Sequence, residues 1–319
     1  MPSDVLEEMK ETNYSWLKQI FMIGLPLSAI IILTIFSDLH KISLLLKKLS
    51  IGTVFILVLI SILRPIIGGL RASFVYRPIG NLSVINASKG YVLSAYGTIF
   101  FPSAVGGDIF RIEHIKNCTG GTRKEAFLVA GLERVVGFLC LLIIAILISF
   151  FELPFLISTT WFLFVIFTTI IGVFIGGYIF IKYKTDSIFI QAKEYVKGYA
   201  TPILLCGVFI LSLIFQCVSL SIPVLVGYSL GGVEVAITIA LMTPFIALFS
   251  TIPISIGGLG LREASYVGLG TLGGIENEIS FLAGLSLSAS IILSGLPGVL
   301  FQRELFESEK FNPMPEGSE

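Results

Sequence analysis

The chain has 319 residues, of which 55% are hydrophobic and only 13% are charged, and its mean hydropathy is +0.95. Because soluble domains carry about 25% charged residues, this composition excludes an ordinary soluble domain and predicts an all-α polytopic integral membrane protein. The formal net charge is zero, so no electrostatic signal points to a nucleic-acid partner.

The residue types that hold metals, disulfides or nucleotides are sparse. The four cysteines contain no C-x-x-C pair, and the two histidines, His40 and His114, lie far apart in the sequence. Neither H-E-x-x-H nor G-x-x-x-x-G-K-[S/T] occurs. We therefore expect no metal, no cofactor and no ATP hydrolysis.

The first part of the chain predicts two membrane spans. Residues 1–15 are polar, and the apolar stretches 17–36 and 49–63 are each followed by charged residues. Arg64-Pro65 is predicted to end the second span, because proline disrupts helices. Residues 64–90 mix cations with glycine, proline and aromatic residues, which predicts a basic elbow at the membrane interface.

A short apolar stretch, 91–101, comes next and is too short to cross a membrane alone. It is predicted to form one arm of a re-entrant hairpin. Thr122 and Glu125 have the spacing of a capping box, so a helix is predicted to begin there. That helix is expected to continue to Phe151 and to end in a turn at 152–154.

The rest of the chain predicts four more apolar segments, with a soft break at Pro223. They cover approximately 155–181, 202–226, 235–250 and 281–301. Together these patterns predict about seven or eight transmembrane segments in one membrane domain over residues 16–302. The Pro- and Glu-rich tail, 303–319, is predicted to be disordered.

Two stretches repeat the pattern P-x-[A/S]-[V/I]-G-G-x-x-[F/L]-R without a gap. Proline and paired glycines break helices, so the motif predicts one or two broken or re-entrant helices in a pseudo-inverted repeat. A chance match is the alternative, since glycine is abundant here. The residues expected to break the helices are Pro102, Gly106, Gly107, Pro253, Gly257 and Gly258.

Lysine and arginine favour the cytoplasmic side of a membrane, and their distribution predicts the orientation. The segments predicted to be cytoplasmic are 64–90, 111–124, 182–199 and the start of the tail, and those predicted to lie outside are 152–154, 227–234 and 276–280. One segment disagrees, because 37–48 carries three lysines and falls on the outer side.

Six charged residues fall inside or beside apolar segments, where a charge costs about 2.5–3.5 kcal/mol at the bilayer centre. They could neutralise one another as structural ion pairs, or line a polar groove. In a groove, arginine forks and the unpaired N–H groups of a broken helix suit a phosphate headgroup. The candidate substrate-binding residues are Asp108, Arg111, Glu133, Arg134, Arg262 and Glu263.

Three stretches of the sequence, P-S-A-V-G-G-D-I-F-R, A-F-L-V-A-G-L-E-R-V-V-G-F and P-I-S-I-G-G-L-G-L-R-E-A, resemble the flippase-like membrane domain of lysylphosphatidylglycerol synthases. The resemblance covers approximately residues 15–302. It implies an all-helical, multi-pass plasma-membrane protein with re-entrant segments that handles a lipid. The soluble aminoacyl-transferring domain of the full-length synthases is not among these residues, so lysyl transfer and other enzymatic activity are not expected.

Two main functions remain open from the sequence, and a third, weaker option is an ion-coupled solute transporter. The first is a lipid translocase of the flippase or scramblase type, which moves a phospholipid, an aminoacyl-phospholipid or a polyprenyl-linked lipid between leaflets through the polar groove. The second is a non-transporting anchor or accessory subunit of a lipid- or glycan-modifying enzyme, with structural charges and basic loops that dock the partner.

Overall fold

The computed structural model describes residues 39–100, 104–156, 190, 194, 197–198, 201–250 and 258–302. The helices of these ranges are α2 (Leu39–Lys48), α3 (Ile51–Tyr76), α4 (Val84–Phe100), α5 (Ala104–Thr119), α6 (Arg123–Leu156), α9 (Pro202–Phe249), α10 (Leu261–Leu272), α11 (Asn277–Gly295) and α12 (Gly298–Phe301). The predicted span 17–36, the tail, and the predicted span 155–181 apart from its first two residues, which belong to α6, lie outside the described residues.

Four helical segments of the described ranges are long and apolar enough to cross a membrane. They are Ile51–Tyr76, Arg123–Ile144, Pro202–Ala247 and Asn277–Phe301. The prediction of a polytopic, all-helical membrane protein is therefore confirmed at this level, and the total of seven or eight spans stays a prediction.

Helix α3 corrects the prediction that Arg64-Pro65 ends a span. The helix begins after Ser50, whose side chain accepts a hydrogen bond from Thr53 N at 3.1 Å, and it continues through Pro65 to Tyr76. Proline removes one backbone donor, but the residues around it remain helical because Pro65 and the following turns are packed against the bundle. Arg64 and Arg71 therefore lie on a helix, and the predicted elbow shrinks to the connection before α4.

Helix α6 begins where the capping box predicts. Thr122 N donates to Glu125 Oε2 at 2.7 Å, and Glu125 N donates to Thr122 Oγ1 at 3.2 Å. The helix then extends to Leu156, so the predicted turn at 152–154 is wrong. Pro154 lies in the last turn of the helix, so the hydrogen bond that it removes is at the helix end, and only two residues follow it before the helix stops.

Helix α9 contains a sharp reversal at Gly232, where φ is 80° and ψ is −165°. This conformation is one that only glycine adopts readily, and it falls within the predicted loop 227–234. The helix passes through Pro223 with no non-helical residue, so the soft break predicted there is wrong. The two halves of α9 fold back on each other: a Cβ atom built on Gly227 would lie 3.6 Å from Ala236 Cα.

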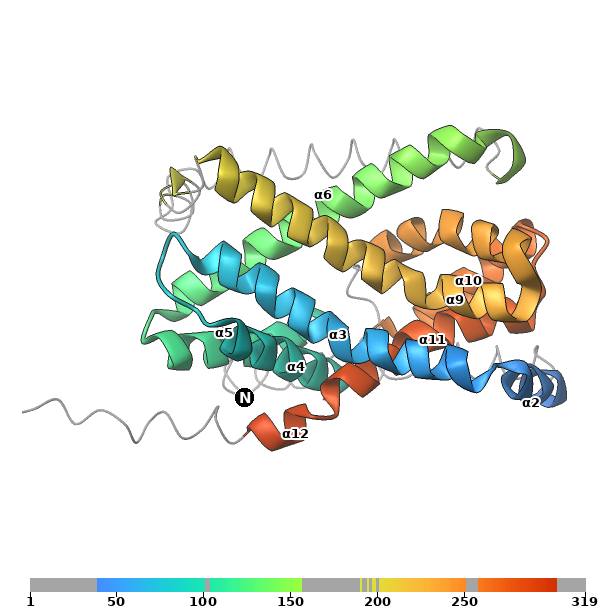
Figure 1. Ribbon diagram of the computed structural model, residues 1–319, viewed down its shortest axis with the longest axis horizontal. Coiled ribbons are helices and arrows are strands. Elements are labelled where there is room, and N and C mark those ends of the chain that lie inside the picture. Colours follow the sequence, from blue (N-terminus) through green and yellow to red (C-terminus); the bar gives the residue numbers. More distant parts are fainter. Residues whose placement is uncertain are drawn as a thin grey trace, which may run out of the picture.

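Two helical hairpins occupy opposite ends of the bundle (Figure 1). One consists of α4 and α5, whose axes approach closely: a Cβ atom on Gly107 would lie 2.9 Å from Thr98 N. The other consists of the second half of α9 and α10, joined by a hydrogen bond of 2.9 Å from Tyr266 to Thr243. Helices α3, α6, α11 and the first half of α9 connect the two ends.

Candidate functional site

A cavity of about 630 Å³ lies between the two hairpins, with walls from α3, α4, α5, α6, α9, α10 and α11. Among the described residues, five arginines and two carboxylates line it, so this part of the lining carries a formal charge of +3. These residues are Arg64, Arg71, Arg111, Arg134, Arg262, Asp108 and Glu133. The described cavity wall thus contains two arginines, Arg64 and Arg71, in addition to the three arginines that the sequence analysis proposed.

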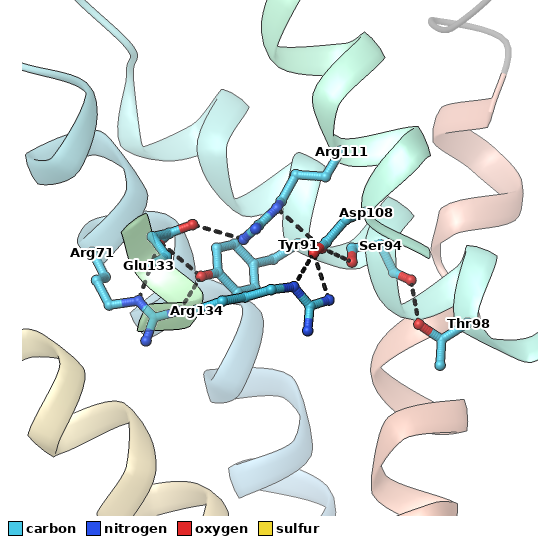
Figure 2. Close-up of polar contacts among 8 residues, drawn as sticks. All are labelled: Arg71, Tyr91, Ser94, Thr98, Asp108, Arg111, Glu133 and Arg134. Atoms are coloured by element: carbon cyan, nitrogen blue, oxygen red, sulfur yellow. Dashed lines mark hydrogen bonds and ion pairs between the residues drawn. The ribbon is translucent and has the colours of Figure 1, made fainter. Parts of the chain in front are cut away.

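Glu133, on α6, is the centre of a buried network (Figure 2). Its Oε1 accepts from Arg71 Nε at 3.1 Å and from the Tyr91 hydroxyl at 2.8 Å, and its Oε2 accepts from Arg111 Nη1 at 2.8 Å. The three donors come from α3, α4 and α5. Because the carboxylate has no exposed surface, these contacts replace the water that would otherwise stabilise its charge.

Asp108, on α5, is the second anion of the network. It accepts from Ser94 Oγ at 2.9 Å and from Arg134 Nε at 2.5 Å, and its Oδ1 lies 3.4 Å from Arg111 Nε. Arg111 therefore links Asp108 to Glu133, as the side chains in Figure 2 show. Glu133 and Arg134 are neighbours in sequence, and they point to different partners as expected for residues about 100° apart on a helix.

Arg71 is a site residue that the sequence analysis missed. Its side chain is buried, its Nη2 donates to the Tyr91 hydroxyl at 2.6 Å, and its guanidinium lies 4.6 Å from the ring centre of Phe215. Its Nη1 is buried and has no hydrogen-bond partner among the residues that the structure describes. The signal that could have identified Arg71 is its spacing of seven residues from Arg64, which places both on one face of a helix.

The second motif contributes Arg262 to the same cavity. Arg262 Nη1 donates to Ser288 Oγ at 2.8 Å, and Ser288 Oγ donates to Glu263 Oε1 at 2.5 Å. The other carboxylate oxygen of Glu263 accepts from Gly260 N at 2.7 Å. Glu263 therefore caps the start of α10 and does not line the cavity, which differs from the predicted groove position.

The glycines of the two motifs lie in different local structures, one pair inside a helix and the other glycine before one. Helix α4 ends at Phe100 and α5 begins at Ala104, so Gly106 and Gly107 lie inside α5, after the break. Gly258 has a φ of 82° and precedes α10. Pro102, Pro253 and Gly257 lie outside the described residues. The two motifs nevertheless meet, because Asp108 and Arg111 line one cavity together with Arg262.

The cavity also reaches the apolar surface of the bundle. Val135, Phe138 and Leu139, on α6, are among its lining residues, and all three are exposed. In a membrane-spanning helix such residues face lipid. A molecule in the cavity therefore lies between an arginine-rich wall and a face suited to acyl chains.

These features define a polytopic membrane protein with a cationic cavity inside a helical bundle. The chain belongs to the family described as the lysylphosphatidylglycerol synthase transmembrane region, whose model matches residues 21–297. Comparison with curated proteins and comparison with solved structures gave no significant match.

Proposed function

We propose that this protein is a lipid translocase that moves a lipid with a phosphate headgroup between the two leaflets. The observation that carries the proposal is the cavity of formal charge +3, lined by five arginines and open to an apolar face on α6. The headgroup passes along the arginine wall, and the acyl chains remain in the bilayer. Family membership supports a lipid-related role.

The charge of the cavity is the physical reason for an anionic headgroup. An arginine in the hydrocarbon region costs about 2.5–3.5 kcal/mol on insertion scales, and two carboxylates neutralise only part of the charge of five arginines. A phosphate accepts paired hydrogen bonds from guanidinium groups. A bound phosphate therefore offsets part of the remaining positive charge.

The two hairpins support a mechanism of alternating access. In this proposal α4–α5 enters the membrane from one face, and the second half of α9 with α10 enters from the other, so that the charged residues after both motifs meet near the midplane. Movement of one hairpin relative to the other then opens the cavity to each leaflet in turn. The protein transports lipid without chemically changing it.

Arg134 is the residue best suited to a test, because its side chain is 41% exposed and its loss still leaves Asp108 beside Arg111 and Ser94. We expect Arg134→Gln to stay folded and to slow lipid translocation by about tenfold, since a charge-assisted hydrogen bond contributes 1.5–3 kcal/mol. The measurement is translocation of labelled phospholipids in proteoliposomes, with thermal unfolding of the same preparations.

The matched control is Arg123→Gln, which removes an arginine from the same helix. Arg123 is 71% exposed and pairs with Glu113 outside the cavity, so translocation should be unchanged. If Arg134→Gln is folded and moves lipid as fast as the control, the cavity is not the lipid path. The alternative, an accessory subunit of a lipid- or glycan-modifying enzyme, would then be favoured.

A further inference from the structure

We propose that Arg64 and Arg262 form a phosphate-binding subsite at the end of the cavity distant from the carboxylate network. The inference rests on the proposed function and deepens it, because it names where the headgroup phosphate is held. Arg64 comes from α3 and Arg262 from α10, and both line the cavity. Arg64 precedes Arg71 by seven residues, which separates their Cα atoms by about 10 Å along the helix.

Helix α11 positions the two arginines. Arg64 Nη1 donates to Ser290 Oγ at 3.2 Å, and Arg262 Nη1 donates to Ser288 Oγ at 2.8 Å. Ile291 also lines the cavity. At about 100° per residue, Ser288 lies about 60° to one side of Ile291 and Ser290 about 100° to the other. The two guanidinium groups therefore approach the cavity from either side of the face that Ile291 presents.

In the described part of the chain, the hydrogen-bond partners of the Arg64 guanidinium are hydroxyl groups and not anions. Among the described residues its guanidinium donates to Ser290 Oγ and, through Nε, to Ser219 Oγ at 3.2 Å, and it forms no ion pair with a carboxylate. Two hydroxyl acceptors use only part of its five N–H donors. The positive charge of Arg262 also acts unfavourably on Arg64. An anion between them would relieve this repulsion and accept the remaining donors.

The opposite end of the cavity explains why the ligand group is a phosphate and not an ammonium. Asp108 and Glu133 are the carboxylates of the described lining, and each already contacts two arginines. An ammonium group needs acceptors, and near Arg64 and Arg262 it would meet like charge. A phosphate monoester or diester needs donors, which this end supplies.

The test measures thermal stabilisation of the purified full chain in detergent by two probes, inorganic phosphate and a short-chain phosphatidic acid. A ligand that binds the folded state raises the melting temperature as its concentration rises. We expect both probes, or the lipid probe alone, to stabilise the wild type. In Arg64→Gln the concentration that gives half of the effect should rise about tenfold or more, and Arg64→Lys should restore part of the loss.

Ser290→Ala provides a second variant, because it keeps both arginines and removes one hydroxyl that positions Arg64. Its expected effect is a weakening of about threefold to tenfold. Arg123→Gln is the control and should bind like the wild type. Stabilisation by the lipid probe alone identifies a lipid headgroup as the source of the phosphate, and stabilisation by both shows that the phosphate chemistry suffices.

The subsite is refuted if neither probe stabilises the wild type, or if Arg64→Gln and Ser290→Ala respond like Arg123→Gln. These results are separable from the translocation test. A chain that binds phosphate through Arg64 but moves no lipid keeps the subsite and loses the proposed function. A chain that moves lipid and binds phosphate independently of Arg64 does the reverse.

Discussion

Glu133 is the residue on which the charge balance of the network depends. It is fully buried and pairs with Arg71 and Arg111 at 3.1 and 2.8 Å. Removing one partner of a buried ion pair costs more than the pair itself contributes, because the charge left behind has neither water nor a counterion. Here the loss of one carboxylate would leave two buried guanidinium groups close to each other.

We therefore expect Glu133→Gln to lower the free energy of unfolding by about 3–5 kcal/mol. The measurement is denaturant unfolding in detergent micelles, followed by helical content. Glu234→Gln is the matched control, because Glu234 is an exposed residue, and its substitution should change stability by less than about 0.5 kcal/mol. Equal stability of the two variants would show that Glu133 is hydrated and not a structural centre.

The site residues show what the sequence can and cannot indicate at this scale. Asp108, Arg111, Glu133, Arg134 and Arg262 line the cavity, in keeping with the need of a charge inside an apolar segment for a polar environment. Their role in binding a substrate stays a prediction. The two missed arginines flank the proline that was interpreted as the end of a span: Arg64 directly precedes Pro65, and Arg71 follows it. The sequence also could not show whether Glu263 caps a helix or lines the cavity, because a carboxylate at the start of a helix is compatible with both.

At the scale of elements, close helix contacts depend on small residues. Helix α11 meets α4 at Gly295, where an added Cβ atom would lie 2.7 Å from Tyr96 N and 2.8 Å from the carbonyl carbon of Ala95. These atoms belong to the backbone of α4, so a side chain cannot be accommodated by a rotamer change. Membrane helices use such residues because packing, and not hydrophobic burial, drives their association.

We expect Gly295→Ala to destabilise the fold by about 1–3 kcal/mol, as overpacking usually does, and to disturb the cavity wall that α4 and α11 share. The control is Gly268→Ala on α10, where an added Cβ atom meets nothing within 4 Å. That substitution should be neutral or stabilising by up to about 1 kcal/mol, because alanine favours helix more than glycine. Thermal unfolding of both variants is the measurement, and a neutral Gly295→Ala would mean that the two helices separate easily.

Element boundaries were predictable where a local hydrogen bond sets them. The capping box of Thr122 and Glu125 begins α6 as expected. The three prolines interpreted as breaks, Pro65, Pro154 and Pro223, all lie within helices. Proline costs one hydrogen bond, whereas an irregular segment in hydrocarbon would leave several backbone groups unsatisfied. Which of these two costs is larger depends on whether lipid or water surrounds the helix, and a short sequence pattern around a proline does not tell the two apart.

At the scale of the whole molecule, ion pairs show which segments lie beside the lysine-containing segment that opposed the predicted orientation. Lys41, on α2, lies 3.0 Å from Glu276 Oε2 and 3.3 Å from Glu278 Oε2. These contacts place the lysine-containing segment at the same end of the bundle as 276–280. A hydrogen bond of 3.1 Å between the hydroxyls of Thr53 and Ser229 places the reversal of α9 at this end as well.

The opposite end of the molecule gathers the other basic connections. Tyr76, at the end of α3, donates to Thr119 Oγ1 at 3.1 Å, so the α3–α4 and α5–α6 connections lie together, and α9 begins at the same end (Figure 1). The first half of α9, residues 202–231, is about 45 Å long at 1.5 Å per residue. This length exceeds the hydrocarbon core of about 30 Å, so the helix is long enough to place the residues before and after it on opposite faces of the membrane.

We therefore expect single cysteines at Lys197 and Glu234 to label differently in a background without the four native cysteines. Both positions are exposed. Positively charged connections stay cytoplasmic, so an impermeant thiol reagent added to intact cells should modify Glu234→Cys and should modify Lys197→Cys only after permeabilisation. Labelling of both positions in intact cells would contradict a crossing between them, and the reversed pattern would place the arginine-rich connections outside. With the reversed pattern, the whole bundle would lie in the membrane the other way up. The cavity would keep its positive charge, so lipid transport would still have its physical basis, but in the opposite direction.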